Sequence, residues 1–160
     1  MEELEQIPPE KRAYIDESGV NKYYIREYGH ALKGVKIEDS KRGKKFHRTN
    51  VVAAKIGDKI VAPYCYTQTM TSALFIEWFR KDFIKSIPKG TTAIMDNASF
   101  HPKVKLKNLA RRHGIKLLFL PPYSPDFNPI EKLWANMKRA LPDILTPDCS
   151  LEQALYKFLL

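Results

Sequence analysis

The sequence has few cysteines, and it has no ligands spaced for a zinc site. Cys65 and Cys149 are its only cysteines, and the four histidines show no zinc-ligand spacing either. Structural zinc sites need pairs of such ligands a few residues apart, so this pattern is not typical of a zinc-stabilised domain. A disulfide between the two cysteines stays open on sequence grounds, and a reduced thiol pair is the simpler interpretation.

Long apolar runs are also lacking. No run approaches the ~20 apolar residues that a membrane-spanning helix needs. The first residues, MEELEQIPPEKR, are acidic and polar, whereas a secretory signal is basic and then apolar. We therefore expect a soluble, cytoplasmic protein with no membrane partner, associated with the nucleoid where it binds DNA.

Acidic residues are in deficit. The 18 Asp and Glu residues face 27 Lys and Arg residues, which gives a net charge of +9 and a pI near 9.5. Such a surplus favours polyanionic partners, nucleic acid first among them. Part of this surplus of basic residues falls in residues 33–48. That segment is either a loop that contacts DNA or simply a run of charges exposed to solvent. The basic side chains assigned to DNA contact there are Lys41, Arg42, Lys44, Lys45 and Arg48.

The 160 residues fit one main domain in which strands and helices alternate. Runs of β-branched and apolar residues predict the strands, and apolar residues at helical spacing predict the helices. This order predicts an α/β fold with a mixed sheet and helices on both faces. The expected strands are 13–16, 50–56, 59–66, 91–95 and 116–120, with 23–28 as a further candidate, and the expected helices are 72–87, 102–113, 129–141 and one after residue 150.

Turn and cap residues mark several boundaries of these elements. Gly57-Asp58 between two apolar runs indicates a β-hairpin. Thr71 or Ser72 can cap the helix that follows. Ser150 with Gln153 three residues later is a capping-box pattern, which indicates the start of the last helix.

Two carboxylates come at the ends of apolar strands. Asp16 follows Ala-Tyr-Ile and is expected to end the first strand, and Asp96 follows Ala-Ile-Met. Ligand sites of open α/β sheets lie outside the carboxyl ends of the strands, so both residues are candidates for chemistry. For Asp96 the alternative is an Asx-turn that leads into the next helix.

Glu131 is the third candidate. Asn128 has the pattern of a helix cap, Pro129 of the first helical residue and Glu131 of the third, where a glutamate completes a capping box. The competing interpretation is a metal ligand. Four prolines among residues 121–129 make the preceding connection stiff, and rigid placement suits a ligand as well as simple packing.

Three carboxylates brought together repel one another unless a counter-charge is present. A divalent metal resolves that cost, and Mg²⁺ prefers oxygen ligands and also accepts phosphate oxygens. Two such ions about 3.5–4 Å apart can assist an in-line displacement at phosphorus. The carboxylates and the basic surface are therefore consistent with metal-dependent chemistry on a nucleic-acid backbone.

Three segments together resemble the DDE transposases of the mariner-like superfamily, particularly their bacterial insertion-sequence branch. The segments are IDESG at 15–19, MDNA at 95–98 with Phe100-His101, and LPPYSPDFNPIE at 120–131. Between Asp96 and Glu131 lie 34 residues (131 − 96 − 1), the spacing typical of that branch. The resemblance covers roughly residues 13–141 and implies a ribonuclease H-like fold with a mixed five-stranded sheet.

The resemblance also implies an activity. Asp16, Asp96 and Glu131 would bind two Mg²⁺ or Mn²⁺ ions, and the enzyme would cut transposon ends and join their 3′ ends to target DNA. Asn97, His101 and Asn128 would shape the site in a lesser role, and for His101 a helix-start cap is the alternative. The expected boundaries are a polar lead-in over 1–12, the DDE catalytic domain over 13–142 and a C-terminal helical extension over 143–160.

The chain departs from the resemblance at its start, because Asp16 leaves no room before it for the helix-turn-helix region that reads transposon ends. One interpretation is a split transposase whose upstream helix-turn-helix polypeptide is encoded separately. The others are a truncated, inactive remnant that binds DNA, a ribonuclease H-like nuclease, and a basic structural protein without activity. Relatives act as dimers on paired ends, which implies a homodimer.

Overall fold

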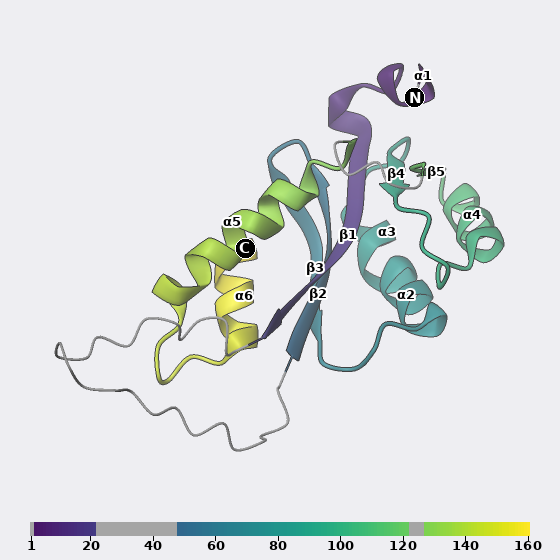
Figure 1. Ribbon diagram of the computed structural model, residues 1–160. Coiled ribbons are helices and arrows are strands. Elements are labelled where there is room, and N and C mark those ends of the chain that lie inside the picture. The colour runs from purple at the N-terminus through teal and green to yellow at the C-terminus, as the bar shows by residue number, and fades with distance from the viewer. Residues whose placement is uncertain (1, 22–47, 122–126) are drawn as a thin grey trace, which may run out of the picture.

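One mixed sheet of five strands, in the order β3-β2-β1-β4-β5, forms the centre of the molecule. The structure is a computed structural model and describes residues 2–21, 48–121 and 127–160 (Figure 1). β1 runs antiparallel to β2 and parallel to β4, and the pair β4 and β5 is also parallel. This confirms the predicted mixed sheet. The strands are β1 (Arg12–Asn21), β2 (Arg48–Ile56), β3 (Lys59–Tyr66), β4 (Thr92–Met95) and β5 (Lys116–Phe119).

The hairpin of β2 and β3 is as predicted. Its last pair, Ile56 with Lys59, leaves Gly57 and Asp58 as a two-residue connection. Gly57 has a φ of 55°, a left-handed conformation that glycine adopts without a steric cost. The hairpin thus places β3 at one edge of the sheet.

β1 differs from the prediction, because it does not end at Asp16. It continues five residues further, to Asn21, and each of these residues pairs with β2. The part of the strand that also pairs with β4 is 12–14, which overlaps the apolar run Ala-Tyr-Ile. Pairing with β2 extends the strand beyond that run, so Asp16 lies mid-strand.

Four helical segments cover one face of the sheet. α2 (Ser72–Trp78), the π-helical turn η3 (Phe79–Phe83) and α3 (Ile84–Ser86) follow one another along the predicted helix, and α4 (Lys103–Arg112) packs beside them (Figure 1). The Thr71 side chain accepts a hydrogen bond from Leu74 N, which confirms it as the cap of α2. The buried side chains on this face include Phe75, Trp78, Phe79, Phe83 and Leu106.

α5 (Ile130–Ile144) and α6 (Leu151–Leu159) cover the other face (Figure 1). The capping box of Ser150 and Gln153 is present in both directions, as predicted. α5 runs three residues beyond its expected end and includes Pro142 in its last turn. The buried residues of the two helices pack with Val51 and Ala53 of β2 to form a second core layer.

The first residues form the short helix α1 (Glu2–Glu5) and the 3-10 turn η1 (Pro9–Lys11). Leu4 is buried against Ile94 and Leu120, so the polar lead-in contributes one side chain to the core.

In the part of the chain that the structure describes, no helix has both the length and the apolar character to cross a membrane. The candidate strand 23–28, the basic segment before Arg48 and the proline-rich residues 122–126 lie outside the described residues.

Candidate active site

The parallel register of β1 and β4 brings two of the predicted carboxylates together. The last residue pair is Tyr14 with Ile94, and the same register carried two residues on places Asp16 opposite Asp96. Adjacent strands lie ~4.8 Å apart, so the two side chains meet at the point where β4 ends. They share a pocket of about 220 Å³, which is lined by Ile15, Asp16, Glu17, Asp96, Phe100 and His101.

Asp16 is the more buried carboxylate. Its pKa is raised from the usual 3.8 to about 6, chiefly by burial, and the nearby carboxylates of Asp96 and Glu17 add to the rise. Hydrogen bonds from the Glu17 backbone and the Trp134 side chain act in the opposite direction and lower the pKa. The indole Nε1 of Trp134 donates to Asp16 Oδ2 over 3.1 Å. Asp16 is thus an anion held in a costly environment that hydrogen bonds partly offset.

Asp96 is open to solvent, with a side chain 61% exposed. Its Oδ1 accepts a hydrogen bond from Ala98 N at 3.3 Å, which is the predicted Asx-turn. That turn and a place in the pocket are compatible, because the turn uses one lone pair and a carboxylate has several. Asp96 therefore makes the Asx-turn and also lines the pocket.

His101 lies behind the two carboxylates. Its Nδ1 is 3.4 Å from Asp96 Oδ1, and its Nε2 is 3.9 Å from Glu17 Oε1. The ring contacts those of Phe75 and Phe100, with centroids 4.5 and 4.3 Å away. Nε2 is buried and has no hydrogen-bond partner among the described residues. His101 therefore faces the pocket from the core side.

The helix-cap interpretation of His101 is wrong. α4 begins at Lys103, its N-cap is Pro102, and the imidazole faces Asp96. Packing between aromatic rings, which the local sequence does not show, draws the side chain inward.

Glu131 is the second residue of α5 and is exposed. It is not among the residues that line the pocket, and over residues 2–21, 48–121 and 127–160 no three acidic, histidine or cysteine side chains gather closely enough to hold a metal ion. The helix is nevertheless tied to the pocket through Trp134, which lies three residues later and on the same side of α5. The capping-box partner of Glu131 is not seen either, since no hydrogen bond joins its carboxylate to Asn128 among the described residues.

The remaining predicted site residues have more ordinary surroundings. Asn97 is exposed beside Asp96. Asn128 is buried, and its Oδ1 accepts from Ile130 N at 3.4 Å while its backbone oxygen accepts from Glu131 N at 3.2 Å. The N-cap of α5 is Pro129, so the helix begins one residue later than the predicted start with Asn128 as its cap. Arg48, the first residue of β2, donates from Nε to Asn50 Oδ1. Lys41, Arg42, Lys44 and Lys45 lie outside the described residues.

Two contacts of the pocket were not expected from the sequence. Trp134 reads as a core residue of an amphipathic helix, and Glu17 as one more surface charge. The available signal was the indole N–H of Trp134, because a buried tryptophan needs a hydrogen-bond acceptor.

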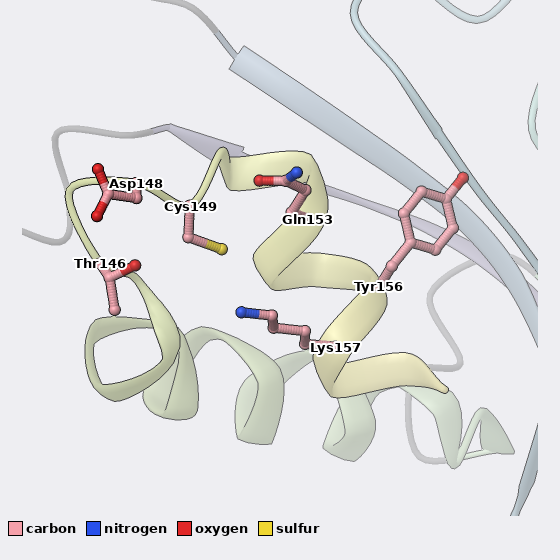
Figure 2. Close-up of a pocket in the computed structure, with 6 residues that line it drawn as sticks. All are labelled: Thr146, Asp148, Cys149, Gln153, Tyr156 and Lys157. Atoms are coloured by element: carbon pink, nitrogen blue, oxygen red, sulfur yellow. The ribbon is translucent and has the colours of Figure 1, made fainter.

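A second hollow, with a volume of about 600 Å³, is lined by the connection after α5 and by side chains along α6 (Figure 2). None of the predicted site residues lines it. Its side chains are Thr146, Asp148, Cys149, Gln153, Tyr156 and Lys157.

The burial of Asp16 predicts an effect on stability. Its carboxyl has a higher pKa in the folded chain than in the unfolded chain, so its favourable contribution is full below about pH 4 and is lost as the pH rises through about 6. A shift of about two pKa units corresponds to on the order of 3 kcal/mol. Asp16→Asn does not titrate. In EDTA, the variant should therefore be more stable than the wild type at pH 8, and the gap should close towards pH 4.

Urea denaturation across pH 4–8 measures that gap. Asp58→Asn is the control, because Asp58 is fully exposed in the hairpin turn and its replacement should open no comparable gap. A constant difference between wild type and Asp16→Asn at all pH values would show that burial does not hold the Asp16 carboxyl in its protonated form.

Comparisons with known proteins agree with this geometry. A family model described as DDE superfamily endonuclease matches residues 11–149. An uncharacterised protein of Sinorhizobium fredii, y4pE/y4sA, is 36% identical over 86 residues, which are 51% of this chain and 56% of that protein. The Caenorhabditis elegans transposable element Tc1 transposase is 33% identical over 61 residues, 38% of this chain and 22% of the transposase. The chain thus spans little more than half of the first relative and less of the second.

Solved structures share the fold. The Mos1 strand transfer complex has a TM-score of 0.64 at 19% identity, covering 94% of this chain and 46% of the Mos1 chain. The catalytic core domain of HTLV-2 integrase, in complex with magnesium, has a TM-score of 0.57 at 17% identity, covering 96% of this chain and 85% of that domain. The sheet with helices on both faces is therefore the ribonuclease H-like fold of transposase and integrase catalytic cores, as predicted.

Proposed function

Because this chain belongs to the DDE superfamily endonuclease family, we propose that it is the catalytic domain of a DNA transposase, which cuts transposon ends and joins their 3′ ends to target DNA. The observation that carries the proposal is the pocket in which Asp16 and Asp96 meet. An enzyme that acts in this way on chromosomal DNA would work at the nucleoid.

The pocket fits a divalent metal by the chemistry of its donors. Asp16 and Asp96 offer only oxygen ligands, which Mg²⁺ and Mn²⁺ accept. Their mutual repulsion and the burial of Asp16 both raise the Asp16 pKa, and a bound cation would offset both costs. Solved relatives include a Mos1 mariner paired-end complex with Mn and an integrase core with magnesium. We assign Asp16, Asp96 and Glu131 as the metal ligands.

Two ions held there would activate the attacking oxygen and stabilise the departing one. The protein side chains place the reaction and exclude water. Asp16 and Asp96 fix the place of the reaction at the end of β4, and His101 and the aromatic rings behind them keep that side of the pocket free of water. In the first step, water attacks phosphorus, the bond to the 3′ oxygen breaks, and that oxygen leaves as a hydroxyl. In the second, the freed 3′ hydroxyl attacks a phosphorus of the target strand, the bond from that phosphorus to its own 3′ oxygen breaks, and that oxygen leaves as a hydroxyl.

A positively charged surface lies one strand away from Asp96. Lys103 and Lys107 of α4 both lie over the ring of Phe119, with their Nζ atoms 5.6 and 5.9 Å from its centroid. Phe119 ends β5 and pairs with Met95, the residue before Asp96. α4 has no acidic residue to neutralise its charge. We assign the two ammonium groups to the phosphates of DNA that enters the pocket.

Removal of both charges should weaken DNA binding and its dependence on salt. For Lys103→Gln with Lys107→Gln, the slope of log affinity against log salt should fall by about 2, because two fewer phosphates are neutralised. Fluorescence anisotropy with a duplex at several salt concentrations measures the slope. The control is Lys59→Gln with Lys85→Gln, which removes the same charge from exposed positions on other elements. Equal slopes for the two double variants would exclude α4 as a specific contact surface.

The test of the proposed function is cleavage. Supercoiled plasmid carrying the transposon ends is incubated with Mg²⁺, Mn²⁺ or EDTA, and nicks and strand-transfer products are mapped. Metal-dependent cuts at the ends, followed by joined products, support a transposase. Cuts only in RNA–DNA hybrids would indicate a ribonuclease instead, and DNA binding that is equal in metal and EDTA without any cut would indicate an inactive remnant.

Partners are part of the proposal. A helix-turn-helix polypeptide would supply recognition of the ends, and a second copy of the chain would hold the paired end. The cleavage assay is therefore run with the chain alone and with the product of any upstream reading frame that encodes such a polypeptide.

A further inference from the structure

The contact between Trp134 and Asp16 joins the sheet to the helix that carries Glu131. The two residues are 118 positions apart in sequence, and Nε1 donates to Oδ2 over 3.1 Å. Trp134 is only 5% exposed and packs in the core layer under α5. The hydrogen bond therefore runs from the core into the pocket.

The two tryptophan indoles of this chain donate to different kinds of acceptor. The other tryptophan, Trp78, donates from Nε1 to the backbone oxygen of Ala62 over 2.9 Å, an acceptor that any sequence could supply. Trp134 uses a carboxylate that also lines the pocket. A hydrogen bond to a charged acceptor is stronger than one to a neutral acceptor, and it restricts the rotation of the carboxylate.

We propose that Trp134 is a positioning residue: it fixes the carboxylate of Asp16 and ties the first turn of α5 to the edge of the pocket. The side chains of residues 131 and 134 lie on the same side of the helix, so the bond that anchors Trp134 also limits where Glu131 can reach. The metal part of this inference rests on the proposed function. The contact itself does not.

The first test is a double-mutant cycle in EDTA, with stability measured by urea denaturation for Asp16→Ala, Trp134→Phe and both together. If Asp16 holds Trp134, the change Trp134→Phe should lower the denaturation midpoint more in the wild-type background than in the Asp16→Ala background. In the Asp16→Ala background the indole has already lost its acceptor, so little remains to be lost. The parallel cycle with Trp78→Phe should be additive with Asp16→Ala. Additive behaviour in both cycles would overturn the inference.

The second test measures Mn²⁺ affinity by calorimetry for the wild type, Trp134→Phe and Trp78→Phe. Loss of a group that orients a metal ligand typically weakens affinity 10–100-fold, so Trp134→Phe should raise the Kd for Mn²⁺ at least about tenfold. Trp78→Phe removes a buried indole that does not line the pocket and donates to Ala62 instead of a carboxylate, so it should leave the Kd unchanged. A merely structural role for Trp134 predicts equal Kd values for the two variants, and that result would overturn positioning.

The two failures are separable. If the wild type binds no Mn²⁺ and cuts no DNA while the cycle with Trp134 still shows coupling, the proposed function fails and the structural contact stands. If the wild type binds Mn²⁺ and Trp134→Phe binds it equally well, the inference fails and the proposed function stands.

Discussion

Asp96→Asn is expected to abolish DNA cleavage, by roughly 10³-fold or more, while the chain stays folded. The structure separates the two roles of this residue. Its structural role is to accept a hydrogen bond from Ala98 N, and an asparagine side chain supplies the same oxygen. Its proposed chemical role needs the negative charge, which asparagine lacks. The side chain is 61% exposed, so the change of charge costs little in desolvation or packing.

Cleavage of plasmid DNA in Mg²⁺ and thermal denaturation in EDTA measure the two roles. Asp58→Asn changes an exposed acid in a turn in the same way and should cut at the wild-type rate. Asp16→Asn should also be inactive, and its combination with Asp96→Asn should add little further loss, as expected of residues that act as one unit. Rapid cleavage by the Asp96→Asn protein would refute the assignment of Asp96.

Local sequence signals were sufficient for most of the fold. The Gly57 hairpin, the Thr71 cap and the Ser150 capping box depend on residues within a few positions of one another, and all three were confirmed. The predicted end of β1 was wrong, because the true end depends on pairing with a distant strand: Asn21 pairs with Arg48 of β2, 27 residues later along the chain (48 − 21 = 27). A strand boundary set by such a partner leaves no mark in the local run of apolar residues.

The pocket was predictable only in part, for the same reason. That Asp16 and Asp96 meet follows from two apolar runs that pair in parallel, and the carboxylates near their ends showed where to look. The contacts of His101 and Trp134 depend on packing between elements far apart in sequence. Their patterns, a histidine before a helix and a tryptophan on an apolar helix face, have commoner explanations, so the sequence alone favoured a cap and a core residue.

Glu131 is where the two interpretations diverge most. The cap interpretation expects its carboxylate to bind the backbone N–H of Asn128, and no such bond is present among the described residues. The metal interpretation expects it at the pocket, and it is not one of the lining residues. Its position on the turn that Trp134 anchors to Asp16 favours the metal interpretation, since a short movement of a long, exposed side chain from that turn suffices.

Glu131→Gln should therefore reduce cleavage by roughly 10³-fold and leave the fold intact. Glutamine keeps the size of the side chain and could still serve a capping box, but it loses the anionic oxygen that a divalent cation requires. The matched control is Glu152→Gln. Glu152 is the second residue of α6, as Glu131 is of α5, and both are exposed acids in a first helical turn. Each change should cost about 0.3–1 kcal/mol of stability through the helix dipole.

The comparison of the two variants isolates the chemistry from the helix. Equal losses of stability in EDTA would show that both glutamates serve their helix starts alike, and any difference in cleavage then belongs to the site. Mn²⁺ should raise the melting temperature of Glu152→Gln as much as that of the wild type, and that of Glu131→Gln less, because a ligand has been removed. If Glu131→Gln cuts DNA at nearly the wild-type rate and gains the same thermal shift from Mn²⁺, Glu131 is not a metal ligand, and the site has only Asp16 and Asp96 as its assigned carboxylates.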